Sequence, residues 1–220
     1  MELFLDTANL EEIRAGINLG VISGITTNPT LIAKEKVEYK SRILEICKLV
    51  SPGPVSVEVL SQEAEGMYEE ALEYSSWAPN VVIKVPIVKE GLRALKLMHA
   101  AQIKTNVTLV FSLNQALLAA LSGATYVSPF VGRLDDIGHE GMELVSQIVR
   151  VYEQFHFRTK VIAASIRHPL HVTQAALAGA HIATVPFPVL EGMLKHPLTD
   201  IGVKKFMEDW QKAKELLEKK

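Results

Sequence analysis

Two patterns of apolar residues alternate along the chain: short runs rich in β-branched residues, and longer segments with an apolar residue every three to four positions. The first is typical of buried strands and the second of amphipathic helices. We expect strands at residues 2–6, 24–27, 55–59, 81–86, 104–110, 125–128, 160–164 and 181–185. We expect helices at 10–19, 40–50, 63–75, 91–101, 113–121, 141–155, 168–178 and 189–194, and a last one from residue 199 to the end.

Strands that alternate with helices predict parallel pairing through right-handed crossovers, and therefore an α/β fold. Eight such units leave about 27 of the 220 residues for each, which suffices for a (β/α)8 TIM barrel. An open doubly wound sheet is the alternative, but the chain has neither a GxGxxG nor a GxxxxGK[ST] motif. We expect residues 1–198 to form one catalytic barrel domain, followed by an extra C-terminal helix at 199–220.

The composition is that of an ordinary globular protein, with 48% apolar and 22% charged residues. Its 23 basic and 25 acidic side chains give a net charge of −2, which argues against a nucleic-acid partner. The first residues do not resemble a secretory signal, and the longest apolar window, 172–190, is interrupted by glutamine, histidine, glycine and proline. We therefore expect a cytoplasmic protein with no membrane partner.

Cysteine and histidine give no indication of a metal site. Cys47 is the only cysteine, and its helical context predicts a buried core thiol. His168 and His171 are three residues apart, but no third ligand follows at a recognisable spacing.

Polar residues gather where the predicted strands end, which is where barrel enzymes carry their active sites. Such residues end or follow seven of the eight strands, although a packed barrel interior favours valine, isoleucine and leucine. The strand-end residues are Asp6, Thr26, Asn28, Glu58, Lys84, Asn106, Thr108, Ser128, Arg133, Ser165 and Arg167. The pattern indicates a functional site at this rim.

Lys84 lies in the run VVIKVPIV, surrounded by β-branched residues. An exposed strand lysine would also fit this local sequence. However, alternation places Lys84 on the face opposite Ile83 and Val85, and helices cover the outer face of a parallel barrel. A lysine that points inward is desolvated, which favours the neutral amine that attacks a carbonyl. We therefore interpret Lys84 as a candidate Schiff-base lysine.

Such a lysine needs groups that move protons, and Asp6 and Glu58 are the carboxylates at strand ends. Glu58 could also form a structural ion pair with Lys84. Asp6 could instead cap the next helix, although Asn9 is better placed for that cap. Thr108 could hold a water molecule between the carboxylates and the imine.

Arg133 and Arg167 follow neighbouring strands, with Ser165 close by in the sequence. Two guanidinium groups suit a phosphate dianion, which they bind through charge-assisted hydrogen bonds. Either arginine alone could equally form a surface ion pair.

These residues lie in motifs that resemble the short-chain transaldolase family, which includes the fructose-6-phosphate aldolases. The resemblance runs along essentially the whole chain and rests on LDTA, GITTNPT, SVEV, VIKVP, TNVTLVFS, YVSPFVGR and AASIRHP. It implies a (β/α)8 barrel of the class I aldolase type and no cofactor. It also favours docking of the C-terminal helix on a neighbouring subunit of a ring-built homo-oligomer, a pentamer or decamer; packing on its own barrel is the alternative.

The resemblance also implies a role for each strand-end residue. Lys84 forms the imine, and the proton-transfer group acts through a bound water. That group comprises Asp6, Glu58 and Thr108. The residues that hold the dihydroxyacetone hydroxyls are Asn28, Asn106 and Ser128. The phosphate site comprises Arg133, Ser165 and Arg167, and the pocket is further lined by Thr26 and Phe130.

The implied reaction moves a dihydroxyacetone unit from sedoheptulose 7-phosphate or fructose 6-phosphate to an aldose phosphate, as in the non-oxidative pentose phosphate pathway. A fructose-6-phosphate aldolase and a non-catalytic phosphosugar-binding barrel remain as alternatives. The aldolase branch of the family carries glutamine where Glu58 stands and tyrosine where Phe130 stands, so this chain follows the transaldolase pattern at both positions.

Overall fold

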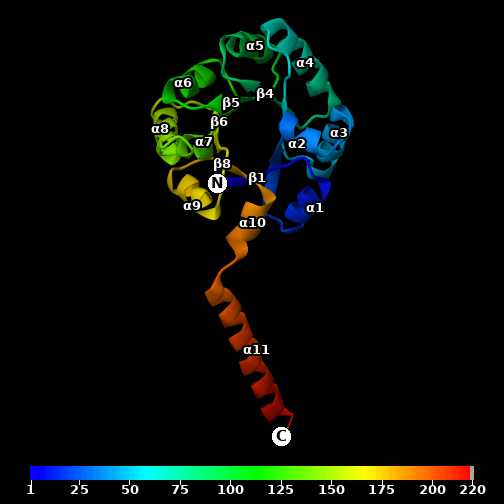
Figure 1. Ribbon diagram of the computed structural model, residues 1–220, viewed down its shortest axis with the longest axis vertical. Coiled ribbons are helices and arrows are strands. Elements are labelled where there is room, and N and C mark those ends of the chain that lie inside the picture. The colour runs from blue at the N-terminus through cyan, green and yellow to red at the C-terminus, as the bar shows by residue number, and fades with distance from the viewer. Residues whose placement is uncertain (219–220) are drawn as a thin grey trace.

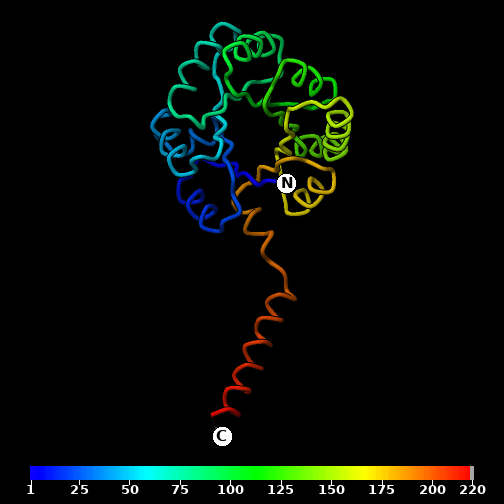
Figure 2. The backbone as a smooth tube through the Cα atoms, turned by 180° about the vertical axis from the view of Figure 1, so that it is seen from behind, coloured from blue at the N-terminus to red at the C-terminus, as the bar shows by residue number. Residues whose placement is uncertain are grey.

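A computed structural model describes residues 1–218, which form a closed barrel of eight parallel strands surrounded by helices (Figure 1, Figure 2). Neighbouring strands follow the chain order, and the last strand pairs with the first. The strands are β1 (Glu2–Asp6), β2 (Ile22–Thr26), β3 (Val55–Glu58), β4 (Val81–Pro86), β5 (Thr105–Val110), β6 (Tyr126–Pro129), β7 (Lys160–Ala163) and β8 (Ile182–Val185).

Most of the described helices form the outer ring of the barrel, and the last one extends away from it (Figure 1). They are α1 (Leu10–Asn18), α2 (Pro29–Lys34), α3 (Tyr39–Val50), α4 (Ala64–Trp77), α5 (Lys89–Ala100), α6 (Leu113–Leu121), α7 (Val131–Asp135), α8 (Gly141–Gln154), α9 (Pro169–Leu177), α10 (Phe187–Leu194) and α11 (Pro197–Leu217). The (β/α)8 barrel predicted from the sequence is therefore confirmed, and the open doubly wound sheet is excluded.

The sequence did not predict the two short helices α2 and α7, which have six and five residues. Neither completes two turns, so no apolar period is visible in its sequence. Both follow a strand directly at the rim where the polar residues gather. They add backbone structure where a barrel usually places its functional groups.

Strand β4 shows how local sequence places a lysine inside the barrel. Its β-branched residues favour an extended chain, and Ile83 and Val85 are fully buried against the surrounding helices. Lys84 points the other way and is also buried, with 6% of its surface exposed. Gly91 lets α5 begin beside the end of this strand, since a Cβ atom there would lie 2.1 Å from the carbonyl oxygen of Pro86.

The strand register brings three polar residues to one level. Glu58 of β3 pairs with Lys84 of β4, and Lys84 pairs with Asn106 of β5. Because paired residues of parallel strands point to the same face, these three side chains belong to the same side of the sheet. The barrel closure therefore fixes their order around the interior.

The last helix, α11, extends away from the barrel (Figure 1, Figure 2). It begins two residues before the predicted start, and none of its residues, all of which the structure describes, is buried. Phe206 and Trp210 are 74% and 62% exposed. The alternative in which this segment packs on its own barrel is not the arrangement observed. Within residues 1–218, no helix has both the length and the apolar character needed to cross a membrane.

We expect α11 to pack against a neighbouring subunit, because large apolar side chains on an isolated helix favour burial. Deletion of residues 199–220 should then lower the particle mass in size-exclusion chromatography with light scattering, while the circular dichroism of the barrel is retained. A truncated protein that stays soluble at the mass of the full assembly would show that α11 has no part in assembly.

Candidate functional site

Two adjoining hollows open at the carboxyl ends of the strands. The smaller one has a volume of about 210 Å³ and the neighbouring one about 580 Å³. Both are lined by Asn28, Lys84, Phe130, Arg133 and Arg167. The first also contains Asp6, Thr26, Ser128 and Ser165, and the second Glu58 and Thr108. The predicted site residues are thus brought together, and Asn106 lies directly behind Ser128.

The Lys84 side chain is fixed at its end by two oxygen atoms. Its Nζ lies 3.1 Å from Oε2 of Glu58 and donates over 3.1 Å to the carbonyl oxygen of Thr27. Glu58 is more open than Lys84, with 17% of its side chain exposed against 7%. The ion pair that the sequence allowed is therefore present, and it aims the amine at the hollow.

Asp6 lies in a network of hydroxyl groups at the ends of β1, β2 and β8. Thr26 donates to Oδ1 of Asp6 over 2.7 Å, and the hydroxyls of Thr26 and Thr184 are 2.6 Å apart. Burial raises the pKa of Asp6 above its ordinary value of 3.8 and outweighs the opposite effects of the Thr26 hydrogen bond and the Lys84 charge. Asp6 is thus poised to hold a proton that an ordinary aspartate would lose. Asn9, as expected, caps α1 instead.

Thr108 presents a buried hydroxyl without a hydrogen-bond partner among the described residues. It lines the second hollow together with Glu58 and Lys84. A buried polar group normally has a partner, which protein or water supplies. The Thr108 hydroxyl is therefore suited to hold a water or a ligand oxygen beside the amine.

Asn106 is fully buried and connects two strands. Its Nδ2 donates to Oγ of Ser56 over 3.1 Å, and its Oδ1 accepts from the Ser128 hydroxyl over 2.7 Å. The chain Ser56–Asn106–Ser128 thus crosses the barrel interior below the rim. Ser128 itself lines the smaller hollow.

Asn28 has a structural task besides its position in both hollows. Its Oδ1 accepts from the backbone N–H of Leu31 over 2.9 Å and so caps α2. Pro29 follows at the first helical position, where no N–H is needed. The cap fixes the orientation of the Asn28 amide.

Phe130 lines both hollows together with Lys84 and the two arginines. The Arg133 guanidinium lies 5.0 Å from the centre of the Phe130 ring, in a cation–π contact. On its other side the ring meets Phe111 edge to face, with centroids 5.9 Å apart. The aromatic ring is therefore held from two sides.

Arg167 is half exposed and pairs with Asp136, with 2.9 Å between Nη2 and Oδ2. Ser165, two residues before Arg167, has a φ of +60°, a value that few residues other than glycine adopt. Gly132 of α7 donates to the Ser165 carbonyl over 3.1 Å. The segment that carries Ser165 and Arg167 lies so close to α7 that a Cβ atom at Gly132 would be 2.7 Å from Nε of Arg167.

No group of three or more potential metal ligands occurs among residues 1–218. The rings of His168 and His171 are tilted against each other with centroids 3.9 Å apart, but His171 pairs with Asp135 instead of pointing into either hollow. Cys47 is buried as predicted, and burial raises its pKa to about 12.

Sequence reasoning missed Ser56, Thr184 and Asp136. Ser56 and Thr184 lie within strands, and a small polar residue in a strand gives no signal of its own. Their importance comes from partners 50 and 158 residues away in the chain. Asp136 directly follows α7, a helix that was not predicted, so the ion pair between Asp136 and Arg167 could not be predicted either.

Comparison with known proteins adds to this geometry. Residues 3–217 match the family model described as transaldolase/fructose-6-phosphate aldolase. Proteins named probable transaldolase from Carboxydothermus hydrogenoformans and Oceanobacillus iheyensis are 60% and 58% identical to this chain. Each alignment covers 97% of the chain and 100% of the relative. A protein of the same name from Desulforudis audaxviator is 61% identical over 97% of the chain and 99% of its own length.

The raised pKa of Asp6 predicts a pH-dependent cost in stability. Above pH 3.8 the unfolded chain loses this proton before the folded one does, so the stability due to protonated Asp6 is lost as the pH rises through its folded pKa. Asp6→Asn, which keeps the Thr26 contact, should therefore become progressively more stable than the parent between pH 4 and pH 7. Linkage limits the gain to about 1.4 kcal/mol per pH unit.

Chemical denaturation at several pH values measures this difference. Glu73→Gln, which removes an exposed carboxylate on α4, is the matched control and should show little change with pH. A stability difference for Asp6→Asn that is constant from pH 4 to pH 7 would contradict the prediction.

Proposed function

Because this chain belongs to the transaldolase/fructose-6-phosphate aldolase family, we propose that it is a Schiff-base transaldolase acting on sugar phosphates. It transfers a dihydroxyacetone unit from sedoheptulose 7-phosphate or fructose 6-phosphate to an aldose phosphate. The reaction belongs to the non-oxidative pentose phosphate pathway and takes place in the cytoplasm. The observation that carries the proposal is the buried Lys84 amine, held 3.1 Å from Glu58 at the floor of a hollow lined by two arginines.

Lys84 is the nucleophile of the proposed mechanism. Glu58 takes a proton from the Lys84 ammonium, and the freed amine adds to the C2 carbonyl of the donor. Return of that proton lets water leave and gives an iminium ion. Glu58 is within hydrogen-bond distance of Nζ and can take and return the proton that this addition moves. The Thr108 hydroxyl, which has no other partner among the described residues, holds a water molecule between the carboxylates and the imine.

Carbon–carbon cleavage follows from the iminium ion. A base takes the proton from the C4 hydroxyl, the C3–C4 bond breaks, and its electron pair passes to the iminium nitrogen to form an enamine. The aldose phosphate leaves as an aldehyde. Asp6 is suited to this step, because burial gives its carboxyl a raised pKa and hence a stronger affinity for the proton.

The enamine then attacks the aldehyde of the acceptor, and the same steps run in reverse. Asn28 and Ser128 face the hollow beside Lys84 and are suited to hold the hydroxyls of the three-carbon fragment. Phe130 offers no hydroxyl group that could activate water there. This favours transfer to an aldehyde over release of free dihydroxyacetone.

The charges of the site suit a phosphorylated sugar. The cationic side chains that line the two hollows are Lys34, Lys84, Arg133 and Arg167, and the carboxylates are Asp6 and Glu58. The arginines lie at the rim, where the far end of a six- or seven-carbon substrate would be. A phosphate dianion there gains charge-assisted hydrogen bonds.

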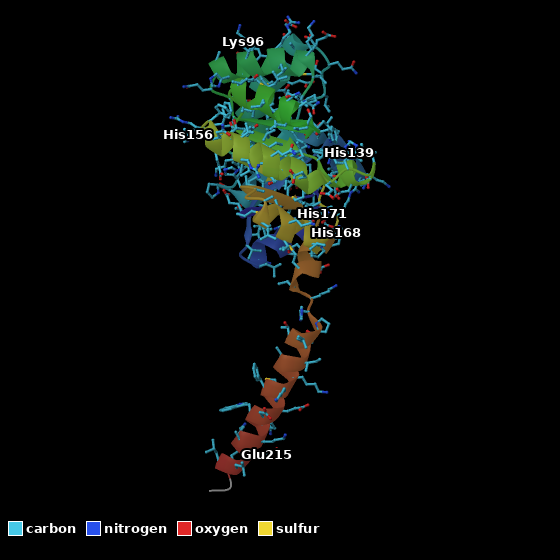
Figure 3. All side chains as sticks on the ribbon, turned by 90° about the vertical axis from the view of Figure 1, so that its left-hand side faces the viewer. Lys96, His139, His156, His168, His171 and Glu215 are labelled. Atoms are coloured by element: carbon cyan, nitrogen blue, oxygen red, sulfur yellow. The ribbon has the colours of Figure 1, made fainter. Side chains whose placement is uncertain are left out.

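Trapping the imine tests the nucleophile. Borohydride reduction with fructose 6-phosphate should attach a three-carbon adduct to Lys84, because this lysine combines burial with a nearby carboxylate. Peptide mass spectrometry locates the adduct. Lys84→Met should abolish both adduct and turnover and keep the fold, since methionine preserves much of the apolar stem. Lys96→Met, at an exposed position on α5 (Figure 3), is the matched control and should retain full activity.

The same preparation distinguishes the alternatives. Release of glyceraldehyde 3-phosphate from fructose 6-phosphate should depend on erythrose 4-phosphate as acceptor. Accumulation of free dihydroxyacetone without an acceptor would instead favour the aldolase. Binding of the sugar phosphate without any adduct, or an adduct on surface lysines, would reject the Schiff-base assignment.

Arg167→Ala should weaken the apparent affinity for phosphorylated donors by about ten- to a hundredfold, as expected for the loss of charge-assisted hydrogen bonds. Initial-rate measurements should show this change in KM, and a much smaller one with free fructose or dihydroxyacetone as donor. Arg150→Ala, which removes an exposed arginine of α8, is the control. Equal losses on phosphorylated and unphosphorylated donors would withdraw Arg167 from phosphate binding.

A further inference from the structure

We propose that His171, held by Asp135, is a positioning residue. It fixes the loop of residues 164–168, here called the Arg167 loop, and thereby sets the affinity for the phosphate group of the substrate. The proposal rests on the phosphate site proposed above and deepens it. His171 belongs to α9 and is buried, with 6% of its surface exposed. It lines neither hollow, so it acts through other residues.

Both nitrogens of the His171 ring are used. Nδ1 accepts from the backbone N–H of Arg167 over 3.3 Å, and Nε2 lies 3.0 Å from Oδ2 of Asp135. Because Nδ1 accepts, the single proton of the neutral ring is on Nε2, which donates to the carboxylate. Burial and the neighbouring His168 lower the pKa of His171, which is consistent with this neutral tautomer.

Asp135 connects the ring to the other arginine. It is the last residue of α7, the five-residue helix that carries Arg133. Its second oxygen accepts from the backbone N–H of Gly141, the first residue of α8, over 2.8 Å. Asp135 is therefore fixed from both sides, and His171 ties the Arg167 loop to the helix that positions Arg133.

The Arg167 loop needs such a tie because it lies beyond the end of β7. The Arg167 side chain is half exposed, so its position depends on the loop backbone and on the surface ion pair with Asp136. The Ser165 conformation, with positive φ, is not one that its own residue type favours. Holding the loop before the ligand arrives reduces the ordering cost of binding, which is a general route to affinity.

Three substitutions separate the contacts of the ring. His171→Leu fills similar space without any hydrogen bond. His171→Gln keeps a donor at the position of Nε2 and lacks the acceptor for Arg167. His171→Asn places an acceptor oxygen at the position of Nδ1 and should preserve the Arg167 contact. His156→Asn is the matched control, because His156 is exposed and lies away from the His168–His171 pair (Figure 3), and asparagine tolerates its φ of +54°.

We expect His171→Leu and His171→Gln to raise KM for fructose 6-phosphate about three- to tenfold, the effect of one hydrogen bond, and to change kcat less than twofold. His171→Asn and His156→Asn should stay within twofold of the parent. With unphosphorylated fructose as donor all four should match the parent. Isothermal titration with inorganic phosphate should show the same order of affinities.

Two results would overturn the proposal: an unchanged KM in both His171→Leu and His171→Gln, or equal losses on phosphorylated and unphosphorylated donors. Should His171→Leu fail to fold, His171→Gln and His171→Asn still give the comparison. The parallel Arg167→Ala measurement separates the two levels of the argument. If Arg167→Ala leaves the KM for phosphorylated donors unchanged, the phosphate site itself fails; if only the His171 variants leave it unchanged, the positioning role fails alone.

Discussion

An ammonium group inside a closed barrel has to be matched by negative charge or by dipoles, because burial removes most of its hydration. Lys84 meets this constraint with one carboxylate and one carbonyl oxygen, each 3.1 Å from Nζ. Both partners come from neighbouring parts of the barrel, and the strand register places Glu58 level with Lys84. The same strand pairing that closes the barrel therefore also fixes the position of the Lys84 amine.

The barrel could be predicted from the sequence because each strand is recognisable from its own residues and their immediate neighbours. Val81, Val82 and Ile83 favour an extended chain, and the amphipathic segment after them favours a helix. It also predicted the rim, because Lys84 or Asn106 in a buried strand contradicts the expected apolar pattern. These signals need only a few neighbouring residues to be read.

The contacts that could not be predicted join residues that are far apart in the sequence or depend on helices too short to recognise. Thr184 meets Thr26 across 158 residues, and each is an unremarkable strand threonine until the barrel closes. His171 gave no sign of a role in the sequence, and only α7, too short to show a period, brings Asp135 to its ring. The C-terminal helix itself was predicted, but the direction in which α11 leaves the barrel has no local signal in the sequence.

The helix cap at Asn28 has a consequence for stereochemistry. Since its amide oxygen is turned toward Leu31, its nitrogen is the atom left for a ligand in the hollow. A ligand hydroxyl at this place must accept a hydrogen bond, and an epimer whose hydroxyl points elsewhere does not make this contact. Asn106 is committed at both ends of its amide in the same way. The helix cap therefore determines, before any ligand enters, that Asn28 offers a donor and not an acceptor to the hollow.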